Sequence, residues 1–188
     1  MQEFLPKVYC YVNEFNLSDL SKLRKNINII YRNYDNIDYL NNLLKLKSFC
    51  KKVNNKLYLS NNIKLSIKLG LNGVYIPSFN KKLNYCGLYN LPENFKVIGS
   101  AHNLKEIRIK NQQGCKEIIL SPIFKNDKSK KFLDIIKFNL IKLNTKTDLI
   151  ALGGINQDNF KRLRSLNLKG FASITWAKKN GLKNIRPF

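Results

Sequence analysis

The sequence predicts a compact (β/α)8 barrel, and three observations lead to this fold class. Eight short apolar runs alternate with helical patterns, no linker or low-complexity segment divides the chain, and the seventh run ends in Gly153-Gly154. Buried parallel strands have this apolar character, and alternation with helices favours parallel pairing. The chain has 188 residues, whereas a complete barrel usually takes about 250. We therefore expect one domain over residues 1–188, with trimmed helices and a truncated C-terminal unit.

Each expected strand is a short run of β-branched, aromatic or other apolar residues. The strands are expected at residues 7–13, 27–33, 56–60, 73–77, 95–100, 117–123, 148–153 and 170–175. Helical patterns lie between them at residues 17–25, 37–53, 63–70, 103–113, 131–143 and 157–166. Residues 79–94 hold too many turn residues for a barrel helix, so we expect a loop with at most a short helical turn. This order permits a closed barrel or a doubly wound sheet.

Helix boundaries carry start and stop signals. Asn16 or Ser18 marks the start of the first helical pattern, and Asn103 starts the fourth with Glu106 three residues later, which is a capping arrangement. Gly70 and Gly114 follow periodic runs, as glycines that end helices do.

The composition restricts the classes of partner. The net charge is +22, from 34 Lys and Arg against 12 Asp and Glu. These cations are scattered and form no basic block, so we do not expect nucleic-acid binding, although a positive field attracts phosphorylated metabolites. Four widely spaced cysteines and one histidine argue against a zinc site and a disulfide framework. Without a membrane span or a signal peptide in the sequence, we expect a cytoplasmic protein. A homo-oligomer remains open.

The residues that follow the strands indicate a phosphate site. In a parallel barrel, functional side chains lie at the carboxyl ends of the strands, and the loops after the last two strands bind phosphate through amide N–H groups. Glycine at positions 153 and 154 permits positive φ and a close approach to a ligand. The alternative is that the two glycines only make a tight turn.

Five motifs in order carry a resemblance to a known family. They are GLNGVYIP, VIGSAHNLKEI, GCKEIILSPIF, LIALGGINQDNFKRL and LKGFASI, with IIYRNYD further upstream. Together they resemble the thiamine phosphate synthase and thiazole tautomerase superfamily over residues 27–176. The resemblance implies a (β/α)8 barrel. Its synthases join hydroxymethylpyrimidine diphosphate to thiazole phosphate with loss of pyrophosphate, using magnesium, and its tautomerases isomerise a thiazole carboxylate phosphate without a metal.

The resemblance also implies roles for individual residues. It places the phosphate at the backbone of Gly153, Gly154, Ile174 and Thr175. Arg32 matches an arginine that contacts the diphosphate, and the alternative is a surface arginine. Ser100 and His102 match a motif whose histidine transfers protons, a task that suits imidazole; the alternatives are a small strand-end residue and a solvated or capping histidine. The remaining expected substrate contacts are Asn61, Ser121, Lys125 and Lys128.

The departures from the family pattern concern the metal and the phosphate loop. Ser60, Asn61 and Asn80 stand where the synthases hold magnesium with an Asn-Asp pair and an Asp. Amides are poor substitutes for carboxylates around a hard dication, so we expect no metal site, and magnesium only where substrate phosphates recruit it. Residues 125–130 replace a Thr-x-Thr-Lys loop, and their lysines either neutralise phosphate or form a solvated loop. Three readings stay open: a synthase-like transferase, a tautomerase-like isomerase, and a barrel that binds its ligand without turnover.

Overall fold

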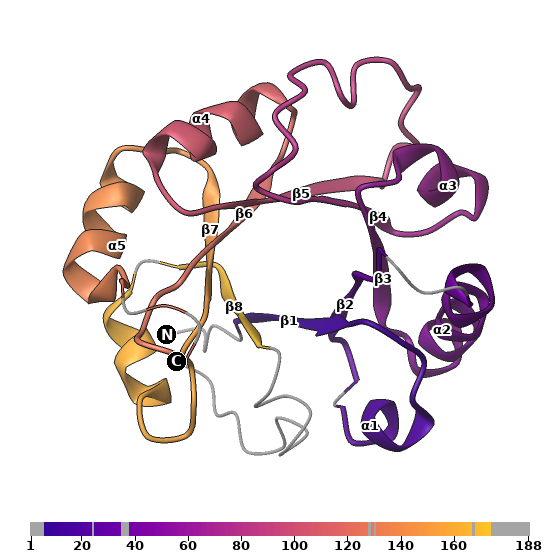
Figure 1. Cartoon of the computed structure of the whole chain (residues 1–188), viewed down its shortest axis with the longest axis horizontal. Coiled ribbons are helices and arrows are strands. Elements are labelled where there is room, and N and C mark those ends of the chain that lie inside the picture. Colours follow the sequence, from indigo (N-terminus) through magenta and orange to yellow (C-terminus); the bar gives the residue numbers. More distant parts are fainter. Residues whose placement is uncertain are drawn as a thin grey trace.

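The computed structural model describes residues 6–23, 25–34, 38–127, 129, 131–166 and 168–173. Eight parallel strands form a closed barrel in sequence order, with β8 paired to β1, which confirms the barrel and excludes the doubly wound sheet (Figure 1). The strands are β1 (Lys7–Val12), β2 (Asn28–Tyr31), β3 (Lys56–Ser60), β4 (Gly73–Ile76), β5 (Lys96–Ala101), β6 (Glu117–Leu120), β7 (Asp148–Leu152) and β8 (Gly170–Ser173).

Helices surround the barrel on its outer side (Figure 1). They are α1 (Leu17–Ser21), α2 (Tyr39–Val53), α3 (Ile63–Lys68), α4 (Leu104–Gln112), α5 (Asp134–Leu143) and the 3₁₀ helix η1 (Phe160–Ser165). The connection between β4 and β5 contains turns and no helix, as expected for residues 79–94. Most of the helices are short, which explains how a chain of 188 residues closes a barrel.

One expected helix has a different form and start. Residues 157–166 were expected to be α-helical, but the helix is of 3₁₀ type and begins at Phe160. The reason is local: the Asn156 and Asn159 side chains each accept a hydrogen bond from the other's backbone N–H, at 3.0 and 2.9 Å, which makes a turn there. Such side-chain bonds compete with helical ones.

Alternation along the strands divides the apolar residues between two cores. The barrel interior holds Tyr9, Tyr11, Ile30, Tyr58, Tyr75, Ile98, Ile119, Ile150 and Ala172. The other face of each strand packs against the helices, where Leu43, Leu46 and Phe138 are fully buried. All four cysteines are buried, and none of them forms a disulfide. No described helix has the length and hydropathy that crossing a membrane requires.

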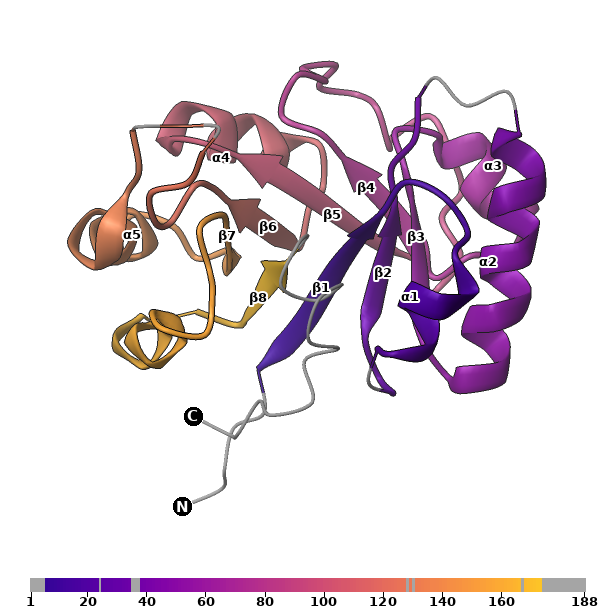
Figure 2. The ribbon, with the colours of Figure 1, turned by 60° about the horizontal axis from the view of Figure 1, so that its bottom comes forward.

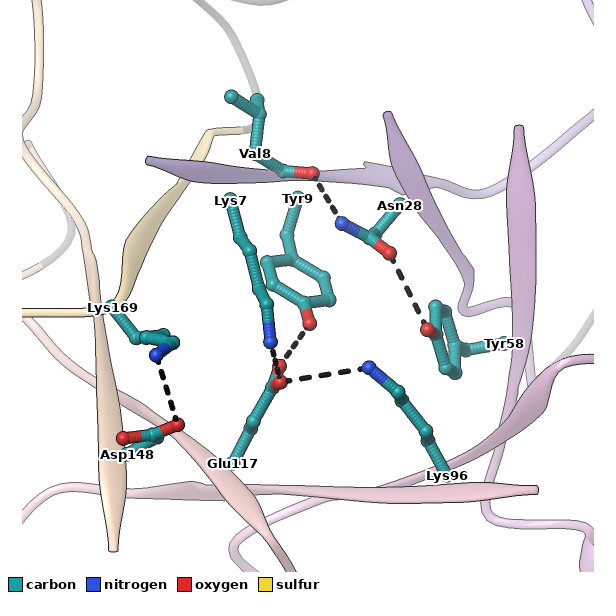
Figure 3. A network of polar contacts seen from close by, with 9 residues as sticks. All are labelled: Lys7, Val8, Tyr9, Asn28, Tyr58, Lys96, Glu117, Asp148 and Lys169. Carbon is teal, nitrogen blue, oxygen red and sulfur yellow. Dashed lines mark hydrogen bonds and ion pairs between the residues drawn. The ribbon is translucent and has the colours of Figure 1, made fainter. Parts of the chain in front are cut away.

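Polar side chains fill the amino-terminal end of the barrel (Figure 3). Lys7 and Tyr9 donate hydrogen bonds to the buried carboxylate of Glu117, and the Lys96 Nζ lies 3.9 Å from it. Burial by itself raises the pKa of Glu117, but these partners outweigh burial and hold the pKa below its usual range. This end is therefore closed by an ion network.

The opposite end of the barrel is shaped by loops. In a parallel barrel all carboxyl strand ends meet at one end, and the long β4–β5 connection extends from that end (Figure 2). Figure 2 also shows that β1 and β2 reach this end.

Candidate active site

His102 lies directly after β5 and is fixed on both sides. Its backbone N–H donates to the Glu106 carboxylate at 2.8 Å, and Asn103 caps α4, as the capping arrangement predicts. The ring Nδ1 lies 2.8 Å from the Ser121 carbonyl oxygen, which can only accept, so Nδ1 carries a proton. In the neutral ring Nε2 is then an acceptor, 3.3 Å from the Ser78 Oγ. This geometry gives an imidazole nitrogen that can take up a proton.

Ser100 and Arg32 lie around a pair of tyrosines from the barrel interior. The Arg32 guanidinium carbon is 5.0 Å from the centre of the Tyr11 ring, and Tyr11 meets Tyr75 edge-on at 5.5 Å. Ser100 is buried and acts to lower the pKa of Tyr75. Burial raises the pKa of both tyrosines, so their hydroxyls stay protonated at neutral pH. Among the described residues, the Tyr11 hydroxyl is the buried side-chain polar atom that has no hydrogen-bond partner.

Asn61 and Asn80 occupy the positions where the resemblance implies metal carboxylates. The Asn80 Nδ2 donates to the Asn61 Oδ1 at 2.7 Å, and the Asn80 Oδ1 accepts from the Lys82 N–H at 3.0 Å. Both ends of the Asn80 amide are thus engaged with protein. Within the described ranges, no three His, Cys, Asp or Glu side chains form a group that could hold a metal ion. The residues present do not fit a magnesium site, because their oxygens are neutral and already bonded.

Two aromatic rings meet across the loops after β2 and β4. Tyr34 is 50% exposed and Phe79 is 63% exposed. Their ring centres are 5.9 Å apart in an edge-to-face contact, and the Tyr34 hydroxyl lies 2.6 Å from the Ser60 Oγ. This pair presents exposed ring faces at the carboxyl end of the barrel.

Gly153 and Gly154 have φ of +96° and +71°, which favour glycine. A Cβ at Gly154 would lie 2.5 Å from the carbonyl oxygens of both Phe124 and Lys125. The loop after β6 thus leaves no room for a side chain at this position. Neither amide N–H of the two glycines donates a hydrogen bond to another described residue. Asn159 donates to the Gly154 carbonyl at 2.6 Å and fixes the orientation of that peptide.

The other expected site residues separate into two groups. Ser121 contacts the His102 ring, and its Oγ is 3.3 Å from Nδ1. Lys125 is exposed on the loop that packs against Gly154. Lys128, Ile174 and Thr175 lie outside the described residues, as does the expected truncated unit at the C-terminus.

Sequence reasoning missed Tyr11 and Tyr75 as neighbours of Arg32. Side chains along a strand point alternately to its two faces, so this alternation could have predicted that both tyrosines lie inside the barrel. It also missed Lys110, which is fully buried on α4, because a lysine in an amphipathic helix is normally read as exposed. A surface groove between α1 and α2, lined by Phe15, Leu44, Phe49, Val53 and their neighbours, lies away from these residues.

A family model described as "Thiamine monophosphate synthase" matches residues 22–176. The chain belongs to this family. The match includes Arg32, Asn61, Ser100, His102 and Gly153-Gly154, so the candidate active site lies within the family segment.

Similar proteins agree with this assignment. The chain is 30% identical over 133 residues to a thiamine-phosphate synthase of Prochlorococcus marinus (strain SARG / CCMP1375), covering 69% of the chain and 38% of that relative. It is 24% identical over 141 residues to the thiamine-phosphate synthase of strain AS9601, covering 73% of the chain and 40% of that relative. The chain therefore spans about 40% of the length of these curated relatives.

Solved structures share the fold. Thiamine phosphate pyrophosphorylase from Pyrococcus furiosus superposes with a TM-score of 0.73 at 15% identity, covering 93% of this chain and 91% of that one. A structure described as native KDPGal superposes with a TM-score of 0.63 at 10% identity, covering 92% of this chain and 84% of that one.

Proposed function

We propose that the chain acts on phosphorylated precursors of thiamine, as a transferase that joins hydroxymethylpyrimidine diphosphate to thiazole phosphate or converts a related thiazole phosphate. The observation that carries the proposal is the coincidence of the family segment, residues 22–176, with a carboxyl strand end that bears Arg32, Ser100 and His102.

The phosphate ester would bind at Gly153 and Gly154. Both glycines have positive φ, and neither N–H donates a hydrogen bond to another described residue. Main-chain amides in this state can bind an anion. Ile174 and Thr175 are proposed as the matching contacts after β8, and Lys125 and Lys128 as cations near the same loop. Asn61 and Ser121 are proposed as polar contacts to the substrate.

Arg32 would bind the diphosphate and stabilise the charge that develops as pyrophosphate leaves. A guanidinium stays charged at all relevant pH and can donate two parallel hydrogen bonds to phosphate oxygens. Its approach to the Tyr11 ring restricts the side chain before substrate arrives. The buried Tyr11 hydroxyl, which burial keeps protonated, would be a further donor close to Arg32. The positive net charge of +22 would also draw anionic substrates toward the chain.

A second candidate function is a metal-independent thiazole isomerase. The observation that favours it is the pairing of Asn61 with Asn80, which leaves a neutral site, together with a His102 Nε2 able to accept a proton. An isomerisation needs a proton moved between two atoms and no leaving group, so it places less demand on charge stabilisation. Arg32 would contribute more to the rate enhancement in the transferase, and His102 would contribute more in the isomerase.

A chromatographic assay for thiamine phosphate, run with both precursors and magnesium, tests the proposal. We expect product with the unaltered chain. Arg32→Lys should lower kcat/KM about 10–100-fold, because a bidentate charged contact contributes about 1.5–3 kcal/mol. Arg108→Lys is the matched control, because Arg108 is exposed on α4; it should change nothing. Absence of product in long incubations would overturn the transferase.

His102→Gln separates the two reactions. Loss of a general acid or base costs about 10²–10⁴-fold, so the isomerase would fall by this factor while the transferase would fall less. If neither reaction occurs but thiazole phosphate binds, the chain is a ligand-binding barrel. Insensitivity of binding to substitution at Gly154, combined with steep salt dependence on nucleic acid, would point to a nucleic-acid partner instead. A cytoplasmic location and a homo-oligomeric state remain expectations.

A further inference from the structure

Lys110 is buried on the face of α4 that packs against the barrel. The side chain is 0% exposed, and lysines are almost never fully buried unless they are paired. Its Nζ donates to the carbonyl oxygens of Pro77 at 2.7 Å and Asn80 at 2.6 Å, and to the Gln113 side-chain oxygen at 2.9 Å. Three oxygens therefore receive the three N–H donors of the ammonium.

Gln113, three residues further along, holds the same segment. Its Nε2 donates to the carbonyl oxygens of Asn80 and Lys82, both at 3.0 Å. The backbone of residues 77–82 is thus attached to the end of α4 by two side chains. This segment begins the long connection from β4 to β5, which has no helix of its own to position it.

The other side of residues 77–82 faces the candidate active site. Ser78 lies 3.3 Å from the His102 Nε2, and Asn80 donates to Asn61 at 2.7 Å. We infer that Lys110 is a positioning residue: its ammonium, acting through the carbonyls of Pro77 and Asn80, sets where Ser78 stands against the His102 ring. The inference deepens the proposed function, because it concerns the same site.

The charge of Lys110 matters to this role. A neutral amine has two N–H donors, so deprotonation leaves one of the three oxygens without its hydrogen bond. Burial lowers the pKa of Lys110 to about 8, although Cys115 and Glu106 act to raise it. The attachment of residues 77–82 should therefore weaken in mildly alkaline solution.

The two thiols near Lys110 do not titrate in that range. Burial raises the pKa of Cys115 to about 12 and that of Cys86 to about 11, so both thiols stay neutral up to pH 9.5. Glu106 is a carboxylate already bonded to the His102 N–H. From β5, Gly99 faces the lysine stem, since a Cβ added there would lie 3.0 Å from the Lys110 Cγ and Cδ, and it brings no charge. The β4–β5 connection presents backbone carbonyls to the two side chains.

The single histidine of the chain can report the weakening of this attachment. Because His102 is the sole imidazole in the sequence, its Cε1–H resonance is unambiguous in an NMR titration of the ligand-free chain. We expect a step with a midpoint near pH 8 between pH 7 and 9.5. Lys110→Met should remove the step. Lys142→Met is the matched control, because Lys142 also donates to a backbone carbonyl, that of Thr147, at 2.9 Å; it should retain the step.

A step that persists in Lys110→Met, or no step in the unaltered chain, would overturn the inference. If Lys110→Met does not fold, Gln113→Met decides: it removes one acceptor of the ammonium, so the step must move to lower pH, and an unmoved step rejects the role of Lys110. The titration contains no substrate. A clear step with no thiamine phosphate in the turnover assay would thus reject the transferase and leave the positioning role intact.

Discussion

Gly154→Ala should destabilise the chain and weaken phosphate binding together. Gly154 has a φ of +71°, and an alanine Cβ would lie 2.5 Å from two backbone carbonyl oxygens. The left-handed conformation alone costs an L-residue about 1–2 kcal/mol. Neighbouring main chain cannot move away easily, because the Phe124 N–H donates to the Gly153 carbonyl at 3.0 Å. Forcing atoms into such a space adds about 1–3 kcal/mol, so we expect a total loss of about 2–5 kcal/mol.

Gly70→Ala is the matched control for this experiment. Gly70 also has a positive φ, +58°, but a Cβ there would meet no heavy atom within 4 Å. It should show the conformational cost without the clash. Urea denaturation should therefore place Gly154→Ala about 1–3 kcal/mol below Gly70→Ala, which corresponds to about 2–12 °C in Tm for a chain of this size. Calorimetric titration with thiazole phosphate should show weaker binding for Gly154→Ala and unchanged binding for Gly70→Ala.

Two results would refute this reasoning. Equal stabilities for the two variants would mean that the loop after β6 does not press against Gly154. Undiminished phosphate binding by a folded Gly154→Ala variant would mean that the amides at residues 153–154 do not hold the phosphate.

Three further predictions concern the ion network, the amide pair and the aromatic pair. Glu117→Gln should lower the unfolding free energy by about 1–3 kcal/mol, less than the full cost of breaking a buried pair, because the Lys7 and Lys96 side chains are 33% and 41% exposed; a cost near zero in urea denaturation would contradict the network's role. Because the pKa of Glu117 lies below its ordinary value of 4.5, its contribution is present above that pH and is lost as the pH falls through the folded-state pKa, so acid titrations of stability should show a steeper loss for the unaltered chain than for Glu117→Gln. The double variant Asn61→Asp/Asn80→Asp should lose stability by like-charge repulsion and regain it in millimolar magnesium, measured as Tm, whereas the unaltered chain should not respond; a magnesium-induced rise of similar size in both would contradict the fit argument. Phe79→Ala, which removes one of two exposed rings 5.9 Å apart, should raise KM with little change in stability, and an unchanged KM would exclude ring contact with the substrate.

Much of the candidate site could be predicted because of where strands end. Arg32, Ser100 and His102 each follow or end an apolar run, and parallel pairing brings such positions to one end of the barrel. The capping pair Asn103 and Glu106 was also readable from spacing alone, and it is present. These features depend on contacts between residues near in sequence or on strand order.

Other features depend on distant contacts and could not be read from spacing. The Asn61–Asn80 hydrogen bond joins two loops, and the hydrogen bonds of the Lys110 ammonium join α4 to the β4–β5 connection. The 3₁₀ form of η1 depends on which hydrogen bonds the Asn156 and Asn159 side chains make. Local propensity does not distinguish these outcomes, because each residue type has several possible partners.

The sequence by itself determined the alternation of buried strands and outer helices, and with it the barrel, because burying apolar runs on both faces of parallel strands leaves few other solutions. Only the tertiary structure decided which polar groups bond to one another: that a lysine on α4 turns inward to hold the backbone at residues 77–82, and that Asn80 donates a hydrogen bond to Asn61 at the carboxyl end. The physical reason is that buried polar groups must find partners, and the identity of the partner depends on how distant segments pack.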